Sequence, residues 1–264
     1  MAQGILDAMT NHVPTLTDYD VIAVSSSAGK DSQTMLRTVV QLATAANVLD
    51  RVVVIHADLG KAEWAGTQEL AAAQAAHYGL PFIVCTKVDT AKAPNDLLDR
   101  VRARGMWPSS AARWCTSDHK RGPIQKVFTQ LAKDWRTDAN VGQPCRILDC
   151  IGMRAQESSA RAKRQAFTPG KIDTKNQRVD EWLPIQDWTE TQVWDSIRRS
   201  GVAYHEAYDL GMSRLSCVFC VLASPADLRI AAKANPALAA EYVAVEVQIG
   251  HTFKNGQSLA EIIG

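Results

Sequence analysis

Short apolar runs alternate with longer amphipathic stretches through the first half of the chain. Val21-Ile22-Ala23-Val24 predicts a buried strand, and residues 32–47 repeat apolar positions at helical spacing. The same alternation predicts strands at 52–55, 82–84 and 146–152, and helices at 63–78 and 123–135. Strands separated by helices predict a parallel sheet with right-handed crossovers. The fold class expected is therefore α/β, a doubly wound and mostly parallel sheet.

The pattern changes after residue 154. The polar stretch 167–180 contains turn formers such as Pro169-Gly170 and predicts a mobile loop. Helical patterns follow at 189–200 and 225–248, and Pro236 is expected to break the second. These changes predict an α/β domain over residues 1–165 and a helical section over 166–264 that packs on it.

Composition excludes several classes of protein. With 46% hydrophobic and 22% charged residues, the chain has the make-up of an ordinary globular protein. No apolar run approaches the ~18 residues of a membrane-spanning helix, and residues 1–10 lack the basic start of a signal peptide. We therefore expect a cytoplasmic protein with no membrane partner. Six cysteines are too few for a disulfide scaffold in a chain of this length, so they favour a metal or redox role.

The formal net charge of +1 conceals two basic stretches. Residues 100–126 carry seven basic side chains against one acidic one, and residues 154–178 carry seven against two. Each stretch alone is equally consistent with a solvated surface. Two of them beside other motifs favour an anionic partner, either a nucleotide phosphate or a nucleic acid.

A serine-rich loop joins the first predicted strand to the first predicted helix. Its sequence is Ser25-Ser26-Ser27-Ala28-Gly29-Lys30-Asp31-Ser32. Small residues let the backbone approach a phosphate, and a helix N-terminus directs N–H groups at it. The loop is not a Walker A motif, because Val24 and Asp31 stand where that motif needs Gly and Ser or Thr. Asp31 suits holding Mg²⁺ against a pyrophosphate, although it could also only cap the helix.

Residues 27–32 of this loop resemble the Ser-Gly-Gly-x-Asp-Ser loop of the ATP pyrophosphatase superfamily (adenine nucleotide alpha-hydrolase-like, PP-loop), with Ala28 in place of the first glycine. His56-Ala57-Asp58-Leu59-Gly60 is similar to the strand end with which that superfamily contacts the nucleotide. Further motifs are similar to its phosphoadenosine phosphosulfate reductase-like branch, and the whole series covers about residues 20–225. They are Arg113-Trp114-Cys115-Thr116 with Lys120, Gly152-Met153-Arg154 with Glu157 and Arg161, Asp187-Trp188-Thr189-Glu190, and Tyr208-Asp209-Leu210-Gly211.

The resemblance implies a binding site for ATP or a related adenine nucleotide, with Mg²⁺. It makes residues 1–165 the nucleotide-binding domain. The nucleotide-binding residues expected are Ser25, Ser26, Ser27, Ala28, Gly29, Lys30, Asp31, Ser32, Asp58 and Arg154. The catalytic residues expected are Lys30, Asp31, Lys120 and Arg154, which would counter the charge that develops on a pyrophosphate leaving group.

Three cysteines form a second group of candidates. Cys217 and Cys220 make a C-x-x-C in the C-terminal section, and Cys115 lies in the first basic stretch. The C-x-x-C alone could be a redox pair, a zinc half-site or a coincidence. Three converging thiolates would suit an iron–sulfur cluster or a zinc site, with Cys145, Cys150 or His119 as a conceivable fourth ligand. We favour a buried apolar role for Cys150 and Cys85.

The resemblance favours metal ligation by Cys115, Cys217 and Cys220, with an iron–sulfur cluster first and zinc second. Cluster-carrying reductases have a Cys-Cys pair where this chain has Trp114-Cys115, so one ligand is missing. The three-cysteine pattern is instead similar to cluster-dependent RNA thiolases. The reductases also carry a catalytic Cys in a C-terminal segment, and no Cys follows Cys220 here.

Three functions remain open from the sequence. The first is an ATP pyrophosphatase or sulfurtransferase that thiolates a nucleic acid, by DNA phosphorothioation or tRNA thiolation. Its partners would be the nucleotide, the DNA or tRNA, and a sulfur-donor protein such as a cysteine desulfurase. The second is a sulfonucleotide reductase. The third is a non-catalytic nucleotide-binding subunit with a structural zinc.

Overall fold

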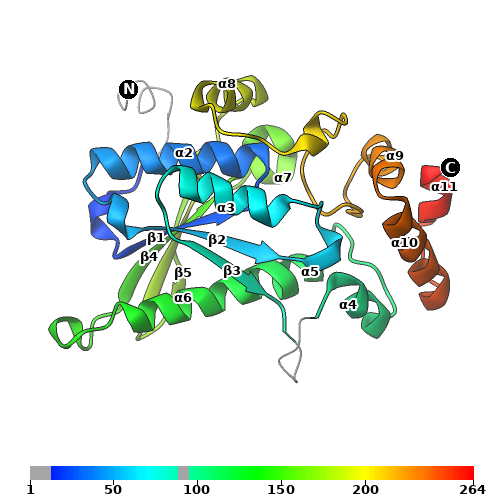
Figure 1. The fold of residues 1–264 in the computed structure, drawn as a ribbon. Helices are drawn as coiled ribbons and strands as arrows, with labels where there is room; N and C mark the ends of the chain where they lie inside the picture. The colour runs from blue at the N-terminus through cyan, green and yellow to red at the C-terminus, as the bar shows by residue number, and fades with distance from the viewer. Residues whose placement is uncertain (1–12, 89–94) are drawn as a thin grey trace. The chain divides into compact units, whose positions relative to one another are not determined.

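A computed structural model describes residues 13–88 and 95–264 (Figure 1). The expectation about residues 1–10 lies outside these ranges. Across the described residues, no helix has the length and apolar character needed to cross a membrane.

A six-stranded sheet carries the fold, in the order β3-β2-β1-β4-β6-β5. β1 pairs in parallel with β2 on one side and β4 on the other, and β4 pairs in parallel with β6. Only β5 runs antiparallel to its neighbour among these pairings. The strands are β1 (Val21–Ser26), β2 (Val52–Asp58), β3 (Phe82–Thr86), β4 (Cys145–Ile151), β5 (Phe167–Asp173) and β6 (Gln177–Trp182). The predicted α/β class with a mostly parallel sheet is confirmed.

Helices cover both faces of this sheet (Figure 1). One face holds α2 (Lys30–Ala45), α3 (Thr67–His77) and α8 (Glu190–Ser200), and the opposite face holds α6 (Gly122–Asp134). Ile22 and Val24 of β1 are fully buried in the core beneath α2. Their side chains alternate with Ala23 and Ser25, as the two-residue period of a strand requires. Both predictions, of central strands and of covering helices, are confirmed.

The stretch 167–180 is not the mobile loop that its polarity predicts. It forms most of the β5–β6 hairpin, and β6 lies beside β4 in the interior of the sheet. The prediction failed because Pro169-Gly170 falls at an irregularity in the register between Thr168 and Ile172, and does not end a strand. On β6, Val179 and Trp182 are buried, so the strand is held by its neighbours.

The helices of the C-terminal section follow the prediction closely. α8 begins after Thr189, whose hydroxyl caps it. The break expected at Pro236 is confirmed, since α9 (Pro225–Ala234) ends there and α10 (Pro236–Ile249) begins. The remaining elements are η1 (Leu16–Asp18), η2 (Leu49–Arg51), η3 (Gly60–Ala62), α4 (Leu97–Arg104), α5 (Trp114–Thr116), η4 (Ser117–Arg121), η5 (Asp138–Asn140), η6 (Ala155–Glu157), α7 (Ser159–Ala162), η7 (Glu206–Tyr208) and α11 (Leu259–Ile263).

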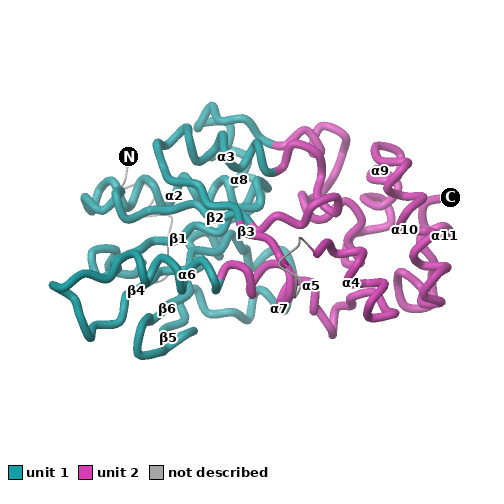
Figure 2. The backbone as a smooth tube through the Cα atoms, turned by 60° about the horizontal axis from the view of Figure 1, so that its bottom comes forward, with its two compact units in different colours: residues 1–56, 68–84, 125–204 teal, residues 57–67, 85–124, 205–264 magenta. Residues whose placement is uncertain are grey.

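The chain divides into two compact units (Figure 2). Unit 1 comprises residues 1–56, 68–84 and 125–204, and unit 2 comprises residues 57–67, 85–124 and 205–264. The predicted domain boundary at residue 165 falls inside unit 1, and it stays a prediction. Unit 2 has an aromatic core of its own, in which the Trp107 ring stacks on Tyr242 at 5.4 Å and meets Phe253 edge-on at 5.1 Å.

Candidate functional site

The serine-rich loop is a compact turn between β1 and α2 in unit 1. Ala28 adopts a left-handed backbone conformation with φ of 55°. The Ser32 hydroxyl donates to the Gly29 carbonyl at 2.9 Å and accepts from the Ser27 N–H at 3.2 Å. These bonds hold the loop against the first turn of α2, where helix geometry leaves backbone N–H groups without an intrahelical partner. The predicted phosphate loop therefore has the backbone shape that an anion site needs.

Charged side chains form a connected network at the start of α2. Lys30 is 3% exposed, and its Nζ lies 3.3 Å from Asp31 Oδ2 and 3.6 Å from Glu190 Oε1. The other Asp31 oxygen, Oδ1, lies 2.5 Å from Arg154 Nε. Two cations thus share one carboxylate. Asp31 as a Mg²⁺ ligand would have to exchange one of these contacts for the metal.

Gln156 joins the two ends of this network, and sequence reasoning did not single it out. Its Oε1 accepts from Arg154 Nη1 at 2.8 Å and from the backbone N–H of Glu190 at 2.9 Å. The Arg154 backbone N–H in turn donates to Glu157 at 3.1 Å. Arg154 is thereby fixed at both its guanidinium and its main chain, and α8 is tied to the same point. The one available signal was the position of Gln156 between Arg154 and Glu157.

Gly152 lets the end of β4 approach the loop. A Cβ atom at this position would lie 2.9 Å from both Cα and N of Ser32. Such a contact is far inside van der Waals distance, so only glycine fits without moving the backbone. The glycine that precedes Met153-Arg154 is therefore a packing requirement of the phosphate loop.

A half-buried carboxyl group lies beside the first residue of the loop. The Ser25 hydroxyl donates to Asp149 Oδ1 at 3.2 Å, and Asp149 is the cross-strand neighbour of Glu181. Burial raises the pKa of Asp149 to about 7, the charge of Glu181 adds to this rise, and the hydrogen bond from Ser25 opposes it. Asp149 therefore titrates near neutral pH. Sequence reasoning missed it, because a lone acid in a strand gives no signal.

The three candidate metal-binding cysteines all belong to unit 2, and their thiols act on one another. Cys115 lies in α5, and Cys217 and Cys220 lie in the loop before α9. Burial raises the pKa of Cys115, and the charge of Cys220 raises it further. Burial also raises the pKa of Cys217 to about 12, with further contributions from Cys220 and Cys115. Three half-buried thiols in one electrostatic neighbourhood are a soft donor set that a cation would stabilise.

This neighbourhood is not a finished metal site. Within residues 13–88 and 95–264, no three His, Cys, Asp or Glu side chains are positioned so that they could hold a metal ion. The ligand set of Cys115, Cys217 and Cys220 stays a prediction. His119 is buried, and its Nε2 has no hydrogen-bond partner among the described residues. Cys150 is fully buried in the core of unit 1, as expected. Cys85 is half-buried in β3.

The other two site residues named from the sequence, Asp58 and Lys120, also belong to unit 2. Lys120 lies in η4, a single turn of π-helix, and its charge lowers the pKa of Cys115 and of Cys217. Asp58 ends β2 and accepts from the Gly60 N–H at 2.7 Å. Their roles toward a nucleotide stay predictions.

Most arginines of the two basic stretches form ion pairs within their own unit. In unit 2, Arg100 and Arg104 share Asp118, at 3.2 and 3.1 Å, and Arg102 lies 3.1 Å from Glu241. In unit 1, ion pairs also join Arg161 to Glu157, Arg164 to Glu181, and Arg178 to Asp173. Much of the positive charge counted along the sequence is therefore already balanced in the fold.

Two curated relatives match part of the chain. An uncharacterized 37.8 kDa protein of Escherichia phage 186 is 28% identical over 134 residues, which are 51% of this chain and 37% of the relative. An uncharacterized protein of Methanocaldococcus jannaschii is 25% identical over 199 residues, 75% of this chain and 36% of the relative. The chain thus spans little more than a third of the length of these relatives.

Among solved structures, a mutant of the FMN adenylyltransferase of Candida glabrata resembles the chain with a TM-score of 0.53. The two are 12% identical, and the likeness covers 82% of this chain and 61% of the other. At this identity it concerns the fold alone. The family model for the phosphoadenosine phosphosulfate reductase domain matches residues 21–223, which include the phosphate loop, Arg154 and the C-x-x-C. The chain belongs to the phosphoadenosine phosphosulfate reductase domain family.

Proposed function

We propose that this chain binds ATP at the phosphate loop, cleaves it to AMP and pyrophosphate, and so drives the thiolation of a nucleic acid. The observation that carries the proposal is the pair of buried cations, Lys30 and Arg154, gathered on Asp31 at the N-terminus of α2. A phosphate chain on that helix terminus would take over both cations from the carboxylate. Asp31, once released, is the residue that would hold Mg²⁺.

The proposed reaction has two steps. An acceptor oxygen attacks the α-phosphorus, the bond between the α- and β-phosphates breaks, and pyrophosphate leaves. Lys30 and Arg154 bind the departing pyrophosphate and counter its charge. Hydrosulfide then attacks the activated centre, and AMP leaves with the acceptor oxygen. The sulfur would come from a donor protein such as a cysteine desulfurase, whose persulfide a thiol reductant converts to hydrosulfide.

Cys115, Cys217 and Cys220 would hold an iron–sulfur cluster, or zinc, in this scheme. Their thiols fit the chemistry of either group, since both take thiolate ligands. An iron–sulfur cluster held by these three cysteines would supply an iron site for sulfur. Lys120 would stabilise the three thiolates by its charge, as it does for two of the thiols here.

The test uses anaerobically purified protein and ATP labelled at the α-phosphate. Release of labelled AMP with pyrophosphate, dependent on Mg²⁺, is the expected result. Asp31→Ala should abolish turnover, while Asp173→Ala, at an exposed acid on β5, should leave it unchanged. An Asp31→Ala protein with full activity would remove the proposed Mg²⁺ ligand. No AMP from the wild-type protein, with or without acceptor RNA or DNA, would refute ATP cleavage.

The family match favours one other candidate, a sulfonucleotide reductase. Here the phosphate loop would bind phosphoadenosine phosphosulfate, and a thiol would take the sulfonate from it. The same protein preparation distinguishes the two functions. Sulfite formed from phosphoadenosine phosphosulfate and thioredoxin, without cleavage of ATP, would establish the reductase.

A further inference from the structure

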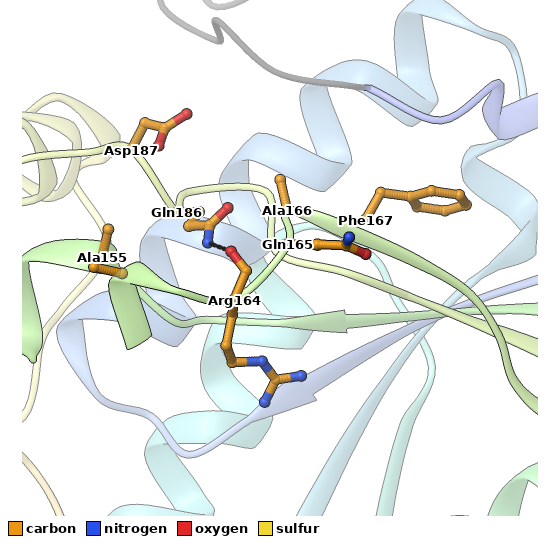
Figure 3. A pocket seen from close by; sticks show the side chains of 8 residues that line it. Ala155, Arg164, Gln165, Ala166, Phe167, Gln186 and Asp187 are labelled. Atoms are coloured by element: carbon orange, nitrogen blue, oxygen red, sulfur yellow. Dashed lines mark hydrogen bonds between the residues drawn. The ribbon is translucent and has the colours of Figure 1, made fainter. Parts of the chain in front are cut away.

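A pocket of about 540 Å³ lies in unit 1, beside the segment that carries Arg154 (Figure 3). Its size is within the ~300–1,000 Å³ usual for small-molecule sites. Ala155, the first lining residue, directly follows Arg154. The lining residues are Ala155, Ala162, Arg164, Gln165, Ala166, Phe167, Gln186 and Asp187. None of them has a role in the function proposed above.

Backbone hydrogen bonds fix the walls of this pocket. The Ala155 N–H donates to the Gln186 carbonyl at 2.8 Å, and the Leu183 N–H donates to the Ala166 carbonyl at 2.8 Å. The segments before β5 and after β6 are thus tied to each other and to η6. The pocket exists before any ligand arrives, so a ligand would not have to order it.

Flat surfaces line part of the pocket. Three alanine residues offer apolar contact, and Phe167, whose side chain packs against the core of unit 1, borders them. Arg164 forms an ion pair with Glu181, whose side chain is only 7% exposed, so the guanidinium has an internal anchor. A planar guanidinium stacks on planar ligands. The lining therefore favours a flat, conjugated group.

Hydrogen-bond acceptors line another part of the pocket. The Gln186 amide nitrogen donates to the Arg164 carbonyl, and this bond turns the amide oxygen away from that carbonyl (Figure 3). Asp187 follows directly and adds a carboxylate, which has acceptor capacity for several bonds at once. Two neighbouring acceptors match a ligand whose edge carries N–H donors.

We propose that this pocket binds a nucleobase with an exocyclic amino group, distinct from the base of the nucleotide on the phosphate loop. Adenine, guanine and cytosine present such an amino group, whereas uracil and thymine do not. The inference rests on the proposed function, because it identifies the base as part of the acceptor. A free nucleotide and a strand of nucleic acid offer the same chemistry.

Binding to the full chain tests the proposal without any ATP cleavage. The probes are the four ribonucleoside monophosphates, by calorimetry, and short labelled single strands of oligo-C and oligo-U RNA, by fluorescence anisotropy. We expect CMP, AMP and GMP to bind about tenfold more tightly than UMP. Tighter binding of oligo-C than of CMP would identify a strand as the source of the base, and equal binding would identify a free nucleotide.

Two variants with matched controls locate the binding. Asp187→Asn should remove the preference for amino-bearing bases, whereas Asp173→Asn on β5 should keep it. Ala166→Phe should fill the pocket and weaken CMP binding at least tenfold, whereas Ala160→Phe, at an exposed position outside the lining, should not. Circular dichroism melting confirms that each variant is folded. The affinity for ATP should be unchanged in all four.

Two results would overturn the proposal. If Ala166→Phe weakens ATP binding together with CMP binding, the pocket holds the adenine of the loop nucleotide. If UMP binds as well as CMP, the pocket is not a base site. The same follows if neither Asp187→Asn nor Ala166→Phe changes the binding of CMP or UMP. A protein that binds CMP as expected yet releases no AMP from ATP would refute the proposed function alone.

Discussion

The candidate sites of the two units differ in whether their reactive side chains already have partners. In unit 1 the charged side chains already satisfy one another, since Asp31 holds both Lys30 and Arg154. In unit 2 the thiols of Cys115 and Cys217 are half-buried with raised pKa values, and among the residues that the structure describes no complete metal-ligand set forms around them. A phosphate site can be built by the chain alone because its cations have carboxylates to exchange. A thiol site needs a cation from outside before its thiolates become stable.

The largest expected effect is on the thiol site. Cys217→Ser should remove bound iron or zinc from anaerobically purified protein, as measured by elemental analysis and by the visible spectrum. The matched control is Cys85→Ser, at a half-buried cysteine of β3, which should keep the metal. Equal metal content in both variants would contradict the ligand set, and the contrast between the two units would lose its basis.

Gly152→Ala tests whether the phosphate site is pre-formed. A Cβ 2.9 Å from the Ser32 backbone has to push α2 away from β4, and we expect nucleotide affinity to fall more than tenfold. The strain should also lower the free energy of unfolding by ~1–3 kcal/mol. Calorimetry with ATP measures the first effect and denaturant unfolding the second. Gly142→Ala, where a Cβ meets nothing within 4 Å, is a control for added volume, although its positive φ carries a cost of its own.

Asp149→Asn tests the half-buried carboxyl group beside the loop. The folded protein holds this proton up to a pKa of about 7, whereas the unfolded chain releases it near 3.8. Between these values the unfolded state binds fewer protons, so wild-type stability falls as pH rises. The Asn variant lacks this slope, and above pH 7 it should be the more stable by up to about 4 kcal/mol. Parallel stability profiles across that pH range would contradict the assignment.

Glu190→Gln should produce the smallest change, and it should raise the affinity for ATP instead of lowering it. Glu190 lies 3.6 Å from the Lys30 ammonium, so it competes with a phosphate for that cation. Its side chain is 53% exposed, and the contact is therefore weak. Removing the charge should tighten ATP binding about two- to fivefold in calorimetry. Weaker binding instead would mean that Glu190 assists the nucleotide, for example through a metal ion.

Sequence reasoning worked where local patterns decide the outcome. The central strands, the turn between β1 and α2, and the break at Pro236 each depend on neighbours within a few residues. It failed for the hairpin after residue 167, because the partner that makes β6 an interior strand is β4, far away in the sequence. The ion pair between Lys30 and Glu190 joins residues far apart in the sequence, and so does the hydrogen bond that Gln156 accepts from the main chain of Glu190. Such contacts arise from the tertiary fold, and no local spacing encodes them.

The β5 strand has a consequence for self-association. It is the outermost strand on its side of the sheet, where unpaired main-chain groups invite a strand from another molecule. Pro169 has no N–H to offer such a strand, and the irregular register beside it interrupts a straight ladder. Lys171 adds a charge on the same strand, 3.8 Å from Glu181. This border of the sheet is consequently a poor template for edge-to-edge aggregation.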